Sequence, residues 1–235
     1  MVAQAPTPKR APKDVCSAVL AAATRLFAAR GFDGTAIQDV ADAVGVSKPA
    51  VLHHFPSKQA LRRGVLEAML LHWQRTLPRL LLAASASEDR FQAVFGELWR
   101  FFAEDTDRAR IVMREVLDRP DEMRTVLRAA VRPWLDAVAG YVRAGQASGR
   151  HHPDVDADAY VVHVLGLVIA ALAGAEVTSA LLDGPARARW DKELARLARA
   201  SLFTASPATA PRAHTHARAK TKTKTKTKAR PRATR

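Results

Sequence analysis

The chain has little of several residue types on which enzymes and secreted proteins depend. Cys16 is the single cysteine among 235 residues, which excludes a disulfide within one chain and a cage of several thiolates around a metal, and which suits a reducing compartment. Glycine accounts for 11 residues, most of them where a helix is expected to end. No glycine-rich phosphate loop, nucleophile elbow or pair of carboxylates with an obvious partner occurs, so we do not expect an enzyme.

Long apolar runs are scarce as well. The segment AYVVHVLGLVIAALAGA, residues 159–175, is 17 residues long and contains His163. A membrane-spanning helix needs about 20 apolar residues, so we interpret this segment as a buried helix at a subunit interface and reject a membrane span. The opening MVAQAPTPKR has no apolar stretch behind its charged residues, so a secretory signal is not expected and the protein should be cytoplasmic.

Acidic residues are missing from both ends of the chain. The formal net charge is +14, and residues 1–13 and 204–235 together hold 13 of the 37 Lys and Arg residues but no Asp or Glu. The stretch 14–203 is nearly neutral, with 24 cations and 23 acids. The C-terminal end includes KTKTKTKTK, residues 220–228, which has nothing apolar to bury and is expected to be disordered. Basic ends of this kind attract polyanions.

Apolar residues recur at the three- and four-residue spacing of helices through most of the chain. No convincing strand occurs, so the expected fold class is all-α. The expected helices cover residues 14–30, 35–44, 48–54, 88–103, 107–117, 121–147, 155–182 and 186–203, with a long additional helix after Ser57.

Turn and cap signals divide residues 35–54 into two short helices. Thr35 followed by Gln38 is a capping-box pattern that starts a helix, and Gly45 can end it in the left-handed conformation. Ser47 is a good N-cap for the next helix, and Pro49 is tolerated in its first turn. Two helices joined by a three-residue turn make a helix-turn-helix.

The stretch from Val15 to about Met69 resembles the DNA-binding domain of the tetracycline-repressor (TetR) family. The matching residues are AAATRLFAARGFDGT and IQDVADAVGVSKPAVLHHFPSKQAL. The resemblance implies a transcriptional regulator, in the first place a repressor, that binds a palindromic operator in double-stranded DNA as a homodimer and is released by a small-molecule ligand. It divides the chain into a disordered basic arm (1–13), a DNA-binding domain (14–72), a helical regulatory and dimerisation domain (73–203) and a disordered Lys/Thr/Arg-rich tail (204–235). A long fourth helix would join the two domains, and no cofactor or metal is expected.

The helix over 48–54 should read the major groove. Val51 and Phe55 lie four residues apart and should face the core, which turns Lys48 and His53 outward, together with Pro49. The expected DNA-contacting residues are Thr35, Ala36, Ser47, Lys48, Pro49, Ala50, Leu52, His53, His54 and Lys58.

Some of these positions have alternative interpretations or depart from the family pattern. His53 and His54 point about 100° apart on a helix, so they do not share a metal easily. His54 could contact DNA, or it could cap the helix or pack beside Phe55. Leu52 stands where the family usually has a tyrosine that contacts phosphate, and Ala36 stands where a second hydroxyl residue is common, so neither position can donate the hydrogen bond that the family pattern implies.

Residues 14–60 contain four cations and four acids, so the DNA-binding domain alone should bind a polyanion weakly. We expect the C-terminal tail to supply affinity that does not depend on sequence and that falls as salt rises. The alternative is a tail that only keeps the protein soluble.

The last two expected helices are the candidate dimer seam, since the helix over 155–182 is apolar nearly all round. The expected interface residues are Leu165, Val168, Leu172, Trp190, Leu194 and Leu197. The expected ligand-pocket residues are Trp99, Phe102, Met113, Trp134, Tyr141 and His163, with a core role as the alternative for each. The segment HHPDVD, residues 151–156, is interpreted as a capped helix start and not as a metal loop. A nucleoid-type architectural DNA binder is the main rival function, and a helical enzyme is a more distant one.

Overall fold

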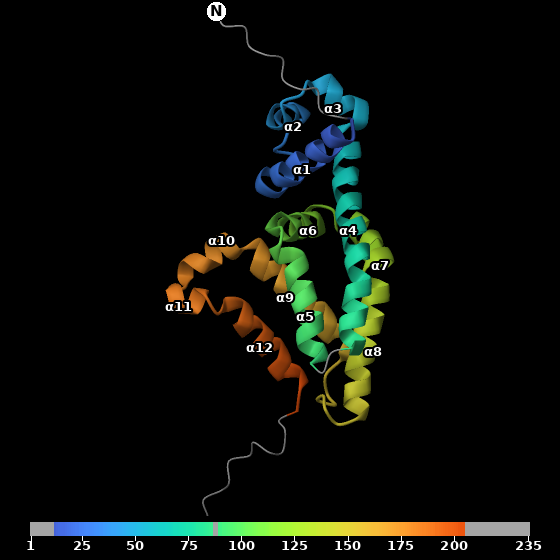
Figure 1. The fold of residues 1–235 in the computed structure, drawn as a ribbon, viewed down its shortest axis with the longest axis vertical. Coiled ribbons are helices and arrows are strands. Elements are labelled where there is room, and N and C mark those ends of the chain that lie inside the picture. The colour runs from blue at the N-terminus through green and yellow to red at the C-terminus, as the bar shows by residue number, and fades with distance from the viewer. Residues whose placement is uncertain (1–11, 87–88, 205–235) are drawn as a thin grey trace, which may run out of the picture. The chain divides into compact units, whose positions relative to one another are not determined.

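The computed structural model describes residues 12–86 and 89–204, and within them the chain is helical, as expected (Figure 1). These residues contain no strand, and a single isolated bridge joins His151 to Phe203. The elements are α1 (Pro12–Arg30), α2 (Ile37–Val44), α3 (Lys48–His54), α4 (Lys58–Ala86), α5 (Arg90–Ala103), α6 (Thr106–Asp118), α7 (Pro120–Ala130), α8 (Arg132–Ala147), α9 (Ala157–Ala173), α10 (Ala175–Thr178), the 3-10 turn η1 (Ser179–Leu181), α11 (Gly184–Arg187) and α12 (Trp190–Leu202). The Lys/Thr/Arg-rich tail after Thr204 lies outside the described residues, as does the basic N-terminal arm up to residue 11.

Three of the expected helices are broken where a single helix was predicted. The stretch 121–147 is divided at Val131 into α7 and α8, because Pro133 in the first turn of α8 has no amide hydrogen to continue the earlier helix. The stretch 155–182 ends as α9 at Gly174, after which α10 and η1 follow. The stretch 186–203 holds the second half of α11 and all of α12. The expected N-terminal arm over 1–13 is also too long, since α1 begins at Pro12.

The first three helices and the start of α4 enclose one small core. Val19, Val40, Val51 and Leu61 are each 0% exposed within it, so every one of these helices contributes a side chain to the same centre. Burial of this kind stabilises a fold by roughly 1.5–3 kcal/mol for each large aliphatic side chain. The expected helix-turn-helix is therefore confirmed as a packed unit.

The caps that divide this unit are partly those expected. Gly31 and Gly45 have φ values of 78° and 75°, the left-handed region that glycine adopts without strain. Phe32 folds back so that its ring lies 5.6 Å from that of Phe27. The second helix differs, because its N-cap is Ala36 and the backbone N–H of Ala36 donates to Asp39 Oδ2 at 2.8 Å. The prediction that Thr35 and Gln38 form a capping box is wrong.

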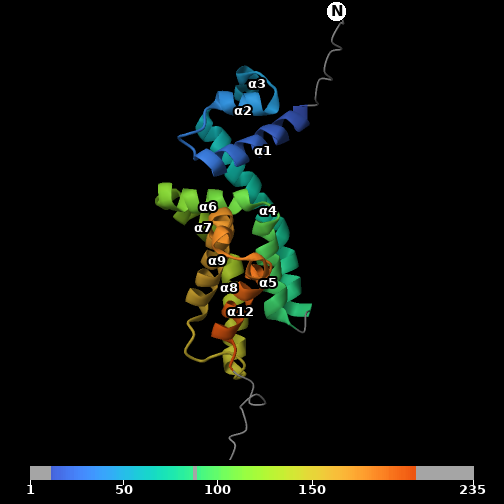
Figure 2. The same cartoon turned by 90° about the vertical axis from the view of Figure 1, so that its left-hand side faces the viewer.

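A second core forms among α4, α5, α8, α9 and α12 (Figure 2). It is rich in aromatic rings, with Trp73 of α4 meeting Phe101 of α5 and Trp134 of α8 at centroid distances of 5.0 and 5.5 Å. The helix α4 continues through Pro78 and belongs to both cores. The helix α6 packs against α1 on one side and α9 on another, and it adds Ile111 to the first core.

No single helix in the described part of the chain is long and apolar enough to cross a membrane. Only when α9 is taken together with residues 175–181 do the described residues reach the length and apolar composition of a membrane span, and these two segments are bent by 70° relative to each other.

Candidate nucleic-acid interface and ligand cavities

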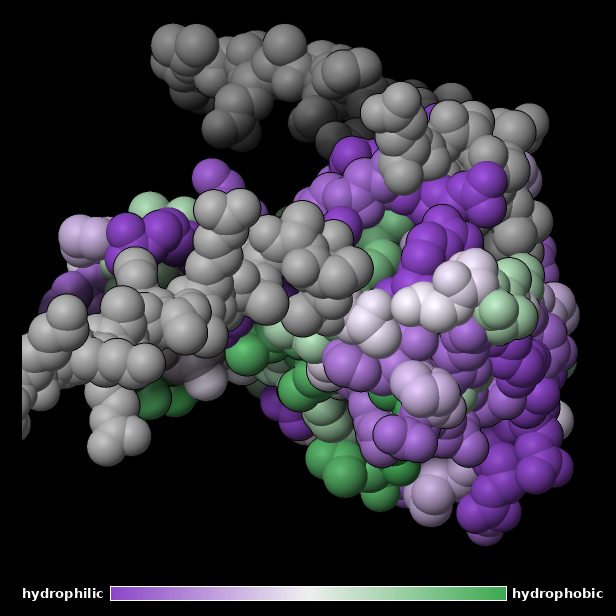
Figure 3. Space-filling view, turned by 90° about the horizontal axis from the view of Figure 1, so that it is seen from below, coloured by the Kyte–Doolittle hydropathy of each residue, from purple (hydrophilic) through white to green (hydrophobic). Residues whose placement is uncertain are grey.

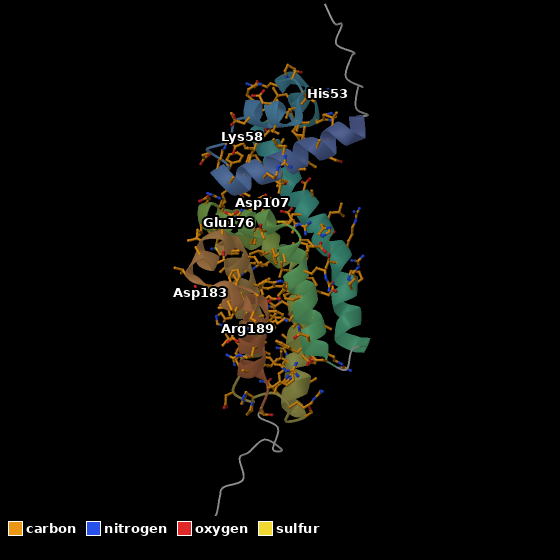
Figure 4. The ribbon with its side chains drawn as sticks, turned by 60° about the vertical axis from the view of Figure 1, so that its left-hand side comes forward. His53, Lys58, Asp107, Glu176, Asp183 and Arg189 are labelled. Atoms are coloured by element: carbon orange, nitrogen blue, oxygen red, sulfur yellow. The ribbon has the colours of Figure 1, made fainter. Side chains whose placement is uncertain are left out.

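The helix α3 presents a polar face to solvent because its apolar residues are anchored inward. Val51 is 0% exposed and Phe55 is half-buried against the same core. Lys48, Pro49 and His53 are exposed on the other side, as the sequence predicted. Figure 4 shows His53 near the outer end of this unit, on the far side of α1 from the helices of the second core. Among the described residues, this face of α3 is therefore open to solvent.

The start of α3 is fixed by its expected cap. Ser47 has extended backbone angles, and its hydroxyl accepts from the N–H of Ala50 at 3.4 Å. Gly45 ends α2 two residues earlier, so the turn between the helices is short. A short, capped turn fixes the direction in which α3 projects from the core.

Thr35 does not belong to this exposed face. Its side chain is 1% exposed, and its hydroxyl donates to the carbonyl of Gly31 at 2.9 Å. The expectation that this hydroxyl contacts phosphate is contradicted, because reaching solvent would break a buried hydrogen bond.

The other expected contact residues lie around the face with varying access. Ala36 is exposed at the start of α2, while Ala50, Leu52 and His54 are half-buried. Lys58 is half-buried at the start of α4, where its ammonium donates to the carbonyl of Asp33 at 3.3 Å. The same ammonium lies 4.4 Å from the centre of the Phe32 ring. These contacts hold Lys58 beside the turn that follows α1.

A buried ion pair that the sequence did not reveal joins the two cores. Arg62 of α4 donates through Nε to Glu115 of α6 at 2.9 Å, and through a terminal nitrogen to Glu122 of α7 at 2.8 Å. The hydrogen bond with Glu115 raises the pKa of Arg62 above its ordinary value, against the opposing effect of burial, so the guanidinium stays charged. The hydrogen bond from Arg62 lowers the pKa of Glu122. The local sequence gives no sign of this contact, because 53 residues separate Arg62 from Glu115.

A second arginine ties α6 to the end of α1. Arg114 donates through Nε to the carbonyl of Ala28 at 3.0 Å and through a terminal nitrogen to that of Ala29 at 3.2 Å. The last carbonyls of a helix have no partner within it, so α6 caps α1 from outside. These bonds fasten α6 to the end of α1, which belongs to the same packed unit as α3.

The six residues expected to line a ligand pocket do not meet in one cavity. Trp134 and Tyr141 line one apolar cavity among α5, α8 and α9, whereas Phe102 lines a second one nearer α4 and α7. Met113 lines an open groove beside α1 instead. Trp99 is half-buried and stacks on Phe95 with 6.4 Å between ring centroids.

His163 was expected inside the apolar helix but lies on its exposed side. Near it on α9, Val162 is 49% exposed and Leu167 is 53% exposed, and on α12 Leu197 is 54% exposed. The face of α9 left uncovered in one chain therefore contains apolar residues and a histidine. Figure 3 shows that apolar surface also lies beside hydrophilic surface on the side seen from below.

Half of the expected dimer-interface residues belong to the core of the single chain. Val168 is 0% exposed and Leu172 is 5% exposed, and Leu165 is half-buried beside them. These three residues face inward, so the prediction is wrong for them. Periodicity could not distinguish the two sides of α9, because the helix is apolar nearly all round.

The N-terminus of α9 is capped, as predicted. Asp156 accepts from the N–H of Ala159 at 2.8 Å. His151 is 1% exposed, and its Nδ1 lies 2.9 Å from the carbonyl oxygen of Val142. Within the described residues, no group of three or more His, Cys, Asp or Glu side chains could hold a metal ion.

Comparison with known proteins gives matches to both parts of the chain. Residues 19–65 match the family described as "Bacterial regulatory proteins, tetR family", and residues 111–189 match "Tetracyclin repressor-like, C-terminal domain". The HTH-type transcriptional regulator RutR of Escherichia coli is 31% identical over 135 residues, which cover 55% of this chain and 62% of RutR. The alignment thus spans less than two thirds of that relative.

One further relative and one solved structure also resemble this chain. The HTH-type transcriptional repressor KstR2 of Mycolicibacterium smegmatis is 26% identical over 147 residues, covering 60% of this chain and 69% of the repressor. The crystal structure of a regulatory protein in the tetR family from Rhodococcus RHA1 superposes with a TM-score of 0.65 at 22% identity, covering 82% of this chain and 98% of that one. At this identity the structural likeness concerns the fold.

Proposed function

Because this chain belongs to the TetR family of bacterial regulatory proteins, we propose that it is a sequence-specific transcriptional regulator that binds operator DNA as a homodimer. A small-molecule ligand bound in the regulatory domain would lower its affinity for DNA. The named relatives include a repressor, and repression is the mode we propose. The protein would then act in the cytoplasm, at the nucleoid.

The exposed polar face of α3 is the observation that carries this proposal. An α-helix fits the major groove of B-form DNA, where its side chains reach base edges and phosphates. Lys48 supplies a cation and His53 supplies ring nitrogens on that face. The buried Val51 fixes the rotation of α3 about its own axis, so this face stays turned outward. Pro49 and Ser47 are small and exposed beside them, so the backbone can approach the duplex closely.

The uncovered face of α9 supports a homodimer. Val162 and Leu167 expose about half of their surface, and apolar faces of this kind are typical of subunit contacts. A twofold axis at α9 and α12 would produce a four-helix seam. A dimer is also what DNA reading requires, since two recognition helices must lie about 34 Å apart to enter successive major grooves.

The link between ligand and DNA would pass through α4 and α6. Leu66 lies one turn after Arg62 on α4, and Leu66 lines the second apolar cavity. Val112 lies one turn before Glu115 on α6 and lines the same cavity. A ligand that widened this cavity would move the two helices joined by the Arg62–Glu115 pair. The result would be a shift between two populations that differ in the spacing of the recognition helices.

Selection of genomic DNA fragments on the purified protein, followed by footprinting, tests the proposal. A single palindromic site with two protected half-sites is expected. Uniform protection of every fragment would favour the nucleoid-type architectural binder instead, for which the basic C-terminal tail is the specific observation. A tail that only adds affinity to the regulator would leave the single palindromic site unchanged.

A further inference from the structure

The two apolar cavities of the regulatory domain have unusually uniform walls. One is lined by residues such as Phe91, Trp134 and Val161, and the other by residues such as Met69, Trp73 and Leu127. The described residues that line them include no Lys, Arg, His, Asp or Glu. The second cavity has a volume of about 50 Å³, so a ligand larger than about one or two water molecules would have to widen it.

The wall between the cavities contains two buried donors without acceptors. Trp73 and Trp134 line different cavities, and their rings meet edge to face, with 5.5 Å between centroids and an interplanar angle of 78°. The two side chains are 5% and 2% exposed. Neither indole Nε1 has a hydrogen-bond partner among the described residues. Buried donors are almost always paired in proteins, so two such donors in contact point to an acceptor that is not part of the chain.

The other polar groups in the cavity walls limit which polar groups a bound ligand can carry. The hydroxyl of Tyr160 already donates to the carbonyl of Ala198 at 2.6 Å. Burial raises the pKa of Tyr141, so its phenol stays neutral. A carboxylate or ammonium group entering either cavity would lose its hydration without meeting an opposite charge, which is strongly unfavourable. An uncharged ligand with a hydrogen-bond acceptor fits both the uncharged cavity walls and the unpaired indole donors.

We propose that the ligand is an uncharged, mainly apolar molecule whose hydrogen-bond acceptor, such as a ketone or ester carbonyl, accepts from the indole N–H of Trp73 or Trp134. This inference rests on the proposed function, since it names the ligand class of the same regulatory domain. The apolar part would enter one cavity and widen it, and the tryptophan in its wall would turn its indole N–H toward the carbonyl, since the walls of the free protein are apolar. Binding would satisfy a donor that the free protein leaves unpaired.

Four probes of similar size test the proposal by calorimetry on the full-length protein without DNA. Ethylbenzene has no acceptor, acetophenone adds a carbonyl, benzoate adds a negative charge and 1-phenylethylammonium adds a positive charge. Trp73→Phe and Trp134→Phe each remove one donor and keep an aromatic ring. Trp99→Phe is the matched control, because Trp99 is half-buried and lines neither cavity.

In at least one of the two variants, acetophenone should bind about tenfold more weakly than to the wild type, as expected for the loss of one hydrogen bond. Ethylbenzene should change by less than about twofold in the same variant, which also shows that its cavity is intact. The Trp99→Phe control should bind both probes as the wild type does, and the two charged probes should not compete with acetophenone.

Three results would overturn the proposal. The ratio of acetophenone to ethylbenzene affinity could be unchanged in both variants, a charged probe could bind as tightly as acetophenone, or neither neutral probe could bind at millimolar concentration. Operator binding is measured separately on the wild type. A protein that binds no operator but keeps the indole-dependent preference for the ketone would contradict the proposed function and leave the ligand class standing.

Discussion

Arg62 and Glu115 form a buried ion pair that joins the helix carrying the DNA-binding unit to the helix that packs across it. Their side chains are 7% and 8% exposed, and Nε of Arg62 lies 2.9 Å from Oε1 of Glu115. A buried pair of this kind is strongly unfavourable when one partner is removed, because the other charge stays in the interior. The pair therefore fixes how α4 and α6 meet, and with it the position of α3.

Replacing Arg62 by methionine should lower the free energy of unfolding by about 3–5 kcal/mol, since the buried Glu115 would lose its hydrogen-bonded partner and keep only Arg119, 3.9 Å away. The double variant Arg62→Met with Glu115→Leu should recover most of this stability, because it leaves no unpaired charge in the interior. Urea unfolding followed by circular dichroism measures both. The control is Arg63→Met at an exposed neighbouring position, and an equal destabilisation there would contradict a special role for the buried pair.

Substitutions on the outer face of α3 should weaken operator binding in two different ways. His53→Ala should lower affinity by about 1–3 kcal/mol and relax the choice of base at one position in each half-site, if the ring reads a base edge. Lys48→Ala should weaken binding to all sequences alike, and it should reduce the salt slope by about one for each phosphate that the lysine no longer neutralises.

Fluorescence anisotropy with the selected operator and with single-base variants separates these effects. Arg128→Ala is the control, because Arg128 is exposed on α7, outside the DNA-binding unit. Wild-type affinity in both α3 variants would contradict the proposed face.

Removing the residues after Thr204 should flatten the dependence of affinity on salt. That segment holds ten Lys and Arg residues and no acid, and each one that neutralises a phosphate steepens the slope by about 0.9. Affinity for operator and for unrelated DNA should fall together, measured from low to high salt. A slope equal to that of the full-length protein would show that the tail has no part in DNA binding.

Leu167→Glu should convert the dimer into monomers, because a carboxylate would enter the centre of the uncovered face of α9. Sedimentation at micromolar concentration measures the change, and the loss of cooperative operator binding should accompany it. Leu117→Glu is the matched control, since Leu117 is 71% exposed on a different helix, α6. A dimer that survives Leu167→Glu would place the interface elsewhere.

The sequence predicted the DNA-binding unit more accurately than the regulatory domain, for physical reasons. Gly45, Ser47 and Val51 act through neighbours within a few residues, so caps and spacing suffice to place α3. Thr35 was misassigned because its hydroxyl bonds to Gly31, four residues back, while the capping carboxylate came from Asp39.

In the regulatory domain the decisive contacts join distant segments. The Arg62–Glu115 pair and the contact between Trp73 and Trp134 leave no local pattern in the sequence. Leu165, Val168 and Leu172 were assigned to the dimer seam because an all-apolar helix gives no signal of which side faces its own core. His163 was assigned to the interior for the same reason.

The most direct test of the account is a cross-link between α3 and the major groove. His53→Cys, in a chain whose single cysteine is replaced by Cys16→Ser, would be offered operator DNA with a thiol tethered to one cytosine in the major groove. We expect a disulfide to form at one position in each half-site, the two related by the twofold symmetry of the operator, and none with the control Arg128→Cys. Equal cross-linking by both variants, or none from position 53 on DNA that the protein binds, would show that α3 does not lie in the groove.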